Sequence, residues 1–192
     1  MGFKMKKVLL DTEKLYYGFP VLLLGYKDSQ HGYNYSTSSS SYTLDDLLVV
    51  GVWKHGGAFE QIKNAKYFTV NIPDESLMKE IEIGGFNSKE SKFKLAPKLS
   101  YEVSSEIDAP IISNCPINLV CEVVKMVEVD PFDQYCHVFA KVKQRFVSEE
   151  LIQNGDLLRH ELAPVLFMGD GKKRIYRYLD VRIEELGSFS KN

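Results

Sequence analysis

Residues 21–53, VLLLGYKDSQHGYNYSTSSSSYTLDDLLVVGVW, contain the pattern that decides the fold. The apolar runs 21–27 and 47–53 have the composition of buried strands, and the serine-rich stretch 33–42 between them is a third strand candidate. The connections are too short for parallel neighbours, which need a crossover of about a dozen residues or more. These segments therefore predict antiparallel pairing.

The rest of the chain adds short helices and more strands. In chain order we expect an amphipathic helix over 59–66, a strand over 67–72 and a helix from a cap at Asp74 to an end at Gly84-Gly85. A turn or two over 88–95, capped by Ser88, and an irregular stretch over 98–116 should follow. We then expect long strands over 117–129 and 135–146, and short strands over 165–168 and 175–178. This pattern favours a mainly β fold with α insertions, an antiparallel barrel, in a single domain over residues 1–192.

Composition excludes several partners. The 24 Lys and Arg residues nearly balance the 26 Asp and Glu residues, so we expect no nucleic acid and no membrane as partners. No apolar run reaches the length of a membrane-spanning helix, and Asp11 and Glu13 interrupt the N-terminal apolar run too early for a secretory signal. The three cysteines include no CxxC pair, which favours reduced thiols and a cytoplasmic location.

The sequence lacks the common catalytic motifs. It has no HExxH, GxSxG or GxxxxGK[ST] motif, and no GxGxxG that follows a strand into a helix. The lone Cys115 is expected to be a packing residue. We therefore expect no catalytic side chain and no metal site, and any chemistry would belong to a cofactor.

The serine run has two interpretations. In an extended chain Ser36, Ser38 and Ser40 point to one face, and the residues between them point to the other. Hydroxyls on both faces suit a strand that lines a polar ligand site. A linker or a solvated edge explains the same pattern equally well, so the residues alone leave both open.

Two groups of cations have a similar ambiguity. Lys54 and His55 precede Gly56-Gly57 and the start of a helix, an arrangement that can hold a phosphate. A solvated lysine and a loop histidine are the more common case. The basic stretch that contains Lys89 and Lys92 is equally well explained as a solvated helix face.

Taken in order, several segments form a familiar arrangement: FPVLLLGYKDSQHGYNYSTSSSS, LLVVGVWKHGGAFEQIKNAKYFTVNIP, GGFNSKESKF, APIISNCPINLVCEV and PVLFMGDGKKRIYRY. Between Pro20 and Tyr178 this arrangement resembles the flavin reductase-like, FMN-binding split-barrel family, which includes the flavoredoxins. The resemblance implies a split β-barrel, a homodimer with FMN near the subunit interface, and a serine run that lines the flavin.

The resemblance also implies site residues. Asn34 would face the ring system, Ser36 and Thr37 the ribityl chain or phosphate, and Lys89 and Phe167 would border the isoalloxazine. Either Lys54 or His55 would neutralise the phosphate. The full candidate set for FMN binding is Asn34, Ser36, Thr37, Ser38, Ser40, Trp53, Lys54, His55, Ala58, Lys89 and Phe167.

This sequence departs from the family pattern at three places. Ala58 stands where members usually have Thr or Ser, Ser40 where an aromatic is frequent, and NSKESK is shorter than the usual SGRD-like motif. The activity implied is hydride transfer from NADH or NADPH to the flavin, with electrons passed to free flavin or to a redox partner protein. The alternatives are an FMN-binding electron-transfer protein that a partner reduces, and a flavin-free interaction domain.

Overall fold

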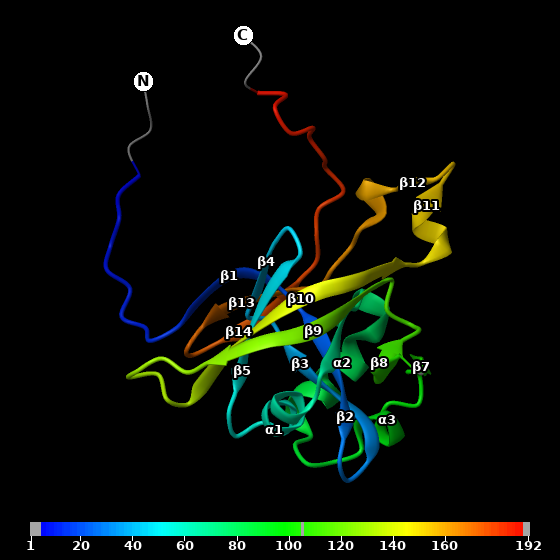
Figure 1. The fold of residues 1–192 in the computed structure, drawn as a ribbon. Coiled ribbons are helices and arrows are strands. Elements are labelled where there is room, and N and C mark those ends of the chain that lie inside the picture. Colours follow the sequence, from blue (N-terminus) through cyan, green and yellow to red (C-terminus); the bar gives the residue numbers. More distant parts are fainter. Residues whose placement is uncertain (1–4, 105, 190–192) are drawn as a thin grey trace.

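A seven-stranded antiparallel sheet dominates the computed structural model, which describes residues 5–104 and 106–189. The order of the strands across the sheet is β3-β2-β6-β9-β10-β5-β4 (Figure 1). Their bounds are β2 Leu22–Asp28, β3 Gly32–Ser38, β4 Ser41–Leu44, β5 Leu47–Trp53, β6 Tyr67–Ile72, β9 Ile117–Val127 and β10 Tyr135–Val147.

The two edges of this sheet are consecutive in the chain. Strands β3 and β4 end the strand order on opposite sides, yet only Ser39 and Ser40 separate them. The sheet therefore curls until its edges approach. There Ser38 Oγ of β3 donates to the Gly51 carbonyl of β5 at 3.4 Å, and the bond from Gly51 N–H to the Ser40 carbonyl at 2.7 Å continues the β4–β5 ladder. No ladder joins β3 to β4, so the predicted antiparallel split barrel is confirmed, with its split at the serine run.

The barrel interior is apolar. Along β10, Cys136, Val138, Ala140 and Val142 are buried, whereas His137 on the opposite face is exposed, as the alternation predicts. Helix α1 (Gly57–Asn64) buries Phe59 and Ile62 against this interior cluster. The helix confirms the predicted one but starts two residues earlier and ends at Asn64, because Ala65 already has extended backbone angles.

A second layer covers the other face of β3. It contains the short helix η1 (Glu75–Leu77), which runs on into helix α2 (Met78–Phe86), and the single turn α3 (Lys92–Leu95). A Cβ added to Gly84 would overlap the Thr37 hydroxyl, so the glycine permits α2 to lie directly on the strand. The glycine pair lies inside the last turn of α2, and Ser91 replaces the predicted Ser88 as the residue before α3.

The prediction of an irregular stretch over 98–116 is wrong in part. Residues 98–116 contain the strand pair β7 (Tyr101–Ser104) and β8 (Ile107–Ile112). A buried amide at Asn71 holds β8 in place: Asn71 Oδ1 accepts from Ile112 N–H at 3.0 Å, and its Nδ2 donates to the Leu23 carbonyl at 2.9 Å. A period-two pattern does not predict β8, because these bonds come from residues far away in the chain and because Pro110 lies inside the strand.

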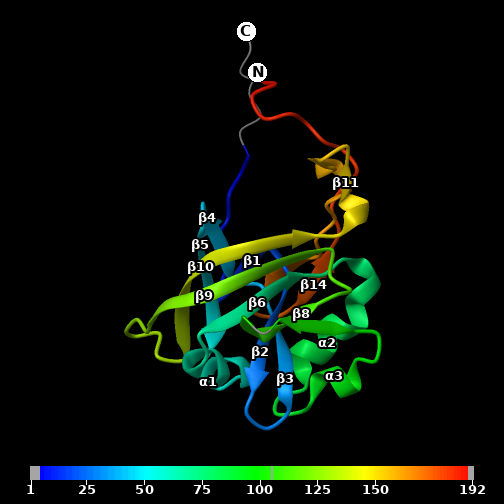
Figure 2. The ribbon, with the colours of Figure 1, turned by 45° about the vertical axis from the view of Figure 1, so that its right-hand side comes forward.

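A smaller sheet packs beside the barrel. Strand β1 (Leu15–Pro20), which the sequence pattern did not reveal, pairs with β13 (Leu166–Asp170), and β13 pairs with β14 (Arg174–Arg177). The remaining elements are η2 (Glu149–Leu151), β11 (Ile152–Gln153), β12 (Asp156–Leu157) and η3 (Arg159–Glu161). The two terminal segments extend away from the body (Figures 1 and 2). Of the helices in the described residues, none has the length and hydrophobicity to cross a membrane.

Candidate functional site

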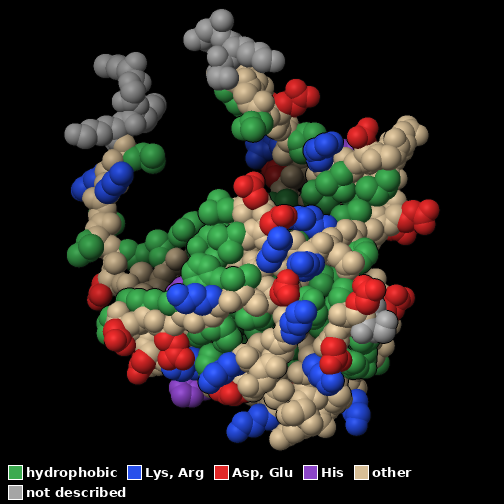
Figure 3. All heavy atoms as spheres, in the orientation of Figure 1, with side chains coloured by type: hydrophobic (Ala, Val, Ile, Leu, Met, Phe, Trp, Pro, Cys, Tyr) green, Lys and Arg blue, Asp and Glu red, His purple; other side chains and the backbone are tan. Residues whose placement is uncertain are grey.

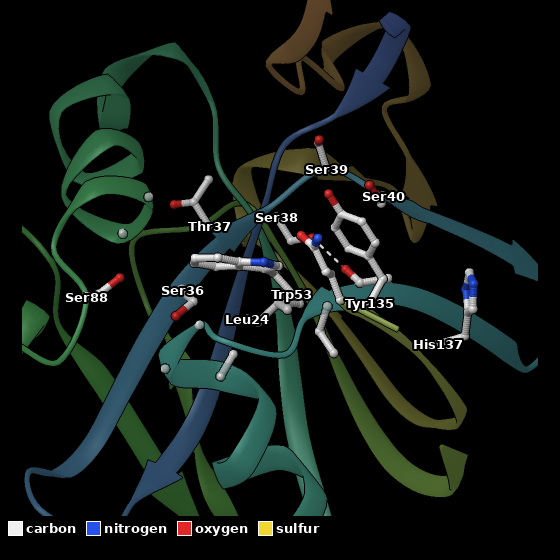
Figure 4. Close-up of a pocket in the computed structure, with 18 of the residues that line it drawn as sticks. Leu24, Ser36, Thr37, Ser38, Ser39, Ser40, Trp53, Ser88, Tyr135 and His137 are labelled. Carbon is white, nitrogen blue, oxygen red and sulfur yellow. Dashed lines mark hydrogen bonds between the residues drawn. The ribbon is translucent and has the colours of Figure 1, made fainter. Parts of the chain in front are cut away.

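A cavity of about 900 Å³ lies along the barrel split. Strand β3 and the following serines form one wall, the end of β5 and the start of α1 form the floor, and β10 contributes Tyr135 and His137 on the opposite side (Figure 4). The last turn of α2 and Ser88 close a further side. The unpaired barrel edge therefore borders this cavity, which we call the main cavity.

The serine run supplies hydroxyls to this cavity on alternating faces. Thr37 Oγ1 donates to the Ile81 carbonyl of α2 at 2.6 Å, whereas Ser36 and Ser38 bond to Tyr26 and Gly51 of the barrel. This arrangement confirms the predicted alternation from Ser36 to Ser38. It also excludes the flexible linker, because each of these side chains is held by a defined partner.

Lys92 is the most unusual residue in the lining. Its side chain is buried at 3% exposure, and its amine donates to Ser36 Oγ at 2.8 Å. No carboxylate among the described residues forms an ion pair with it. Burial lowers the pKa of Lys92 to about 8, and the charge of Asp28 opposes this only in part. The solvated-face interpretation therefore fails at Lys92.

Two hydroxyls lie between this lysine and the start of α1. Ser36 Oγ is also hydrogen-bonded to the Tyr26 hydroxyl at 2.9 Å, and a Cβ added to Gly57 would lie 3.4 Å from the same hydroxyl. Gly56 occupies the N-cap position without a side-chain oxygen, so the first-turn amides of α1 receive no side-chain cap. We call Tyr26, Ser36, Gly57 and Lys92 the Lys92 cluster. It combines a buried cation, hydroxyls and the positive end of a helix dipole.

Aromatic side chains surround another part of the cavity. Trp53 is 50% exposed, Tyr135 42% and Phe132 64%, so all three present ring surface to solvent. In the view of Figure 4 the Trp53 indole lies between Thr37 and Ser36 of the serine strand. The cavity thus has a polar, cationic region and a region suited to a planar ring.

Six of the eleven candidate residues line this cavity: Ser36, Thr37, Ser38, Ser40, Trp53 and Ala58. The hydroxyl missing at Ala58 leaves a buried methyl group there, with 6% of the residue exposed. Which of these residues contact a ligand remains a prediction.

The structure places the other candidates outside that lining. Asn34 is 2% exposed, and its amide holds the loop before α3 by donating to the Glu90 carbonyl and accepting from Lys92 N–H. The Lys54 amine pairs with Glu128, and His55 packs edge-on against Trp53. Lys89 has an exposed side chain and a positive φ of 66°. Their roles toward a ligand stay predictions.

Phe167 belongs to a neighbouring cavity of about 370 Å³.

Sequence reasoning gave no site role to Lys92, Tyr135 or Arg174, all of which line the main cavity. The available signal for Lys92 was its place within the basic stretch, but its neighbour Lys94 shares that signal and is exposed. Only the fold of α3 against β3 separates the two lysines.

A family model described as the flavin reductase like domain matches residues 16–175. Flavoredoxin of Desulfovibrio vulgaris (Miyazaki F) is 20% identical with a TM-score of 0.83, covering 97% of this chain and 100% of that one. Flavoredoxin from Methanosarcina acetivorans is 20% identical with a TM-score of 0.82 and the same coverage. An FMN-binding protein from Thermus thermophilus is 13% identical with a TM-score of 0.72, covering 96% and 99%.

The three structural likenesses show a shared fold. The family match covers more than half of the chain, including the serine run, the start of α1 and the strand that carries Phe167. The protein therefore belongs to the flavin reductase-like domain family.

Proposed function

We propose that this protein binds FMN in the 900 Å³ cavity and acts as an NAD(P)H-dependent flavin reductase. The observation that carries the proposal is the Lys92 cluster, a buried cation that lacks an ion-pair partner among the described residues and adjoins the start of α1. A buried charge of this kind is costly unless an anion joins it. FMN has a phosphate at one end and a planar ring system at the other.

The residues present fit such a ligand. In the proposal, Lys92 and the first-turn amides of α1 hold the phosphate, the serine strand bonds the ribityl hydroxyls, and Trp53 borders the ring system. The cavity volume lies within the usual range for cofactor sites, about 300–1,000 Å³. When bound, FMN would supply the redox chemistry by accepting a hydride from the nicotinamide and passing electrons on. The protein's own part is to hold and orient the reactants.

The test begins with binding. FMN and riboflavin are titrated separately into the purified protein, with flavin fluorescence as the readout. FMN should bind more tightly than riboflavin, which lacks the phosphate. No binding of either flavin would refute the proposed function and favour a flavin-free interaction domain.

Turnover is then measured with NADH and with NADPH in the presence of FMN. Nicotinamide oxidation above the protein-free rate is expected with at least one donor. Tight FMN binding without turnover on either donor would refute the reductase assignment and support an electron-transfer protein that a partner reduces.

We also propose that the protein is a homodimer. Large apolar side chains are strongly exposed on both terminal segments, for example Leu9 at 98% and Val181 at 95%, and on β1 and β4, for example Tyr17 and Leu44. Figure 3 shows hydrophobic side chains gathered near β4 and on the segments above it. A second copy would cover such surface. Light scattering on the eluting protein should give twice the 21.9 kDa chain mass; a monomer at high concentration would contradict this proposal.

A further inference from the structure

The cavity of about 370 Å³ beside the main one has a lining of its own. Val21, Phe86, Phe167 and Tyr176 give it apolar and aromatic walls. The Phe167 and Tyr176 rings are 6.1 Å apart at an interplanar angle of 59°. We call this space the Arg174 cavity, because Arg174 is the only cation in its lining among the described residues.

Its size suits a compound with one aromatic ring. A protein cavity of about 150 Å³ is enough to hold benzene. The Arg174 cavity therefore has room for a substituted ring but is much smaller than the main cavity. Its rings can pack against the edge or face of a planar ligand.

The charges in the lining define the substituent. Within residues 5–104 and 106–189, the Arg174 guanidinium forms no ion pair. A guanidinium presents a planar fork of donors that matches a carboxylate. Glu82 lies in the same lining and disfavours a second negative charge. These two charges favour a ligand with a single negative charge.

We propose that the Arg174 cavity binds a small aromatic monocarboxylate, with Arg174 holding the carboxylate and Phe167 and Tyr176 contacting the ring. The two cavities share Thr37, Ser38, Ser39, Gly85 and Arg174 in their linings. A ligand here thus adjoins whatever fills the main cavity. The proposal of binding stands on the residues of the Arg174 cavity alone and does not depend on the proposed FMN function.

Benzoate is the probe, titrated calorimetrically into FMN-free and FMN-loaded protein, with benzamide as its neutral analogue and phthalate as the dianion. Benzoate should bind more tightly than either. Arg174→Gln should weaken benzoate binding about 10- to 100-fold, the usual effect of losing a charge-assisted hydrogen bond, and should affect benzamide much less. Lys172→Gln, which removes an exposed cation in the turn before β14, is the matched control and should change neither affinity.

A second variant tests the opposing charge. Glu82→Gln should raise the affinity for phthalate relative to benzoate. Equal benzoate affinity in the wild type and Arg174→Gln, or no benzoate binding to either protein form, would overturn the proposal. Should the protein fail to bind FMN, the proposed function falls, yet the titration of the FMN-free protein still decides whether this cavity binds a carboxylate.

Discussion

Replacing Lys92 with Met tests the assignment of the phosphate site most directly. Methionine keeps an unbranched apolar stem of similar length but removes the amine. Ser36 retains its hydrogen bond to the Tyr26 hydroxyl, so the substitution leaves that hydroxyl with a partner. Two opposite effects are expected, one on the stability of the ligand-free protein and one on FMN binding.

The stability effect follows from burial. The pKa of Lys92 is lowered from 10.5 to about 8 because desolvation disfavours the charged form. At about 1.4 kcal/mol for each pH unit, this corresponds to about 3 kcal/mol of destabilisation below pH 8. The unfolded chain binds the proton more tightly, so this cost disappears as the pH rises from 8 to 10.5. Ligand-free Lys92→Met should therefore be about 2 to 3 kcal/mol more stable than the wild type at pH 7, with the difference closing above pH 8.

The binding effect has the opposite sign. Loss of a charge-assisted hydrogen bond to the phosphate should weaken FMN binding by about 1.5 to 3 kcal/mol, or about 10- to 100-fold. Riboflavin binding should change little. Above pH 8 the wild type should lose FMN affinity as the free amine deprotonates, whereas Lys92→Met should not show this loss.

Urea unfolding at several pH values measures the first effect, and fluorescence titration of FMN and riboflavin measures the second. Lys94→Met, an exposed lysine in the same turn, is the control and should behave as the wild type does. Unchanged FMN affinity in Lys92→Met, or equal losses for FMN and riboflavin, would refute the placement of the phosphate.

Three further variants probe the surroundings of the site. Lys54→Ala combined with His55→Ala should leave the FMN dissociation constant within about twofold in a fluorescence titration, because neither residue lines the main cavity; a tenfold loss would return the phosphate to the position implied by the family resemblance. Gly84→Val should lower both the midpoint of thermal unfolding and FMN affinity, since its side chain would overlap Thr37 and push α2 from β3; an unchanged midpoint would mean that α2 shifts freely. Asn71→Ala should destabilise the protein by about 3 kcal/mol in urea unfolding, because the buried amide bonds three other strands; a loss below about 1 kcal/mol would show that water replaces it.

Some parts of the fold could be predicted because their cause is local. The alternation along β10 and the apolar face of α1 depend on residues only a few positions apart in the chain, and both occur as expected. Strand β8 is different, because its backbone is held by Asn71, which is 41 positions away from Ile112 in the chain. The hydrophobic pattern of residues 98–116 alone therefore does not indicate this strand.

The candidate site also combines features with a local cause and features that depend on the fold. The hydroxyl run is visible in the sequence, and its alternation from Ser36 to Ser38 could be anticipated. The distinction between Lys92 and Lys94 could not, since it depends on Asn34, whose side chain accepts from Lys92 N–H at 3.0 Å and fixes the turn that buries one lysine. Burial decides which of several similar cations can serve a site, and burial is a property of the fold.

The place of the site follows from the barrel closure. A strand rich in serine contributes little apolar surface, so pairing β3 with β4 across the split would bury hydroxyls that need partners. The chain instead leaves that edge open, and at its end Ser38 Oγ donates to the Gly51 carbonyl of β5. An open edge presents unpaired backbone groups as well as hydroxyls. A polar ligand that offers both donors and acceptors would bond to such groups, so the residues that keep the barrel open are also suited to line the proposed ribityl phosphate.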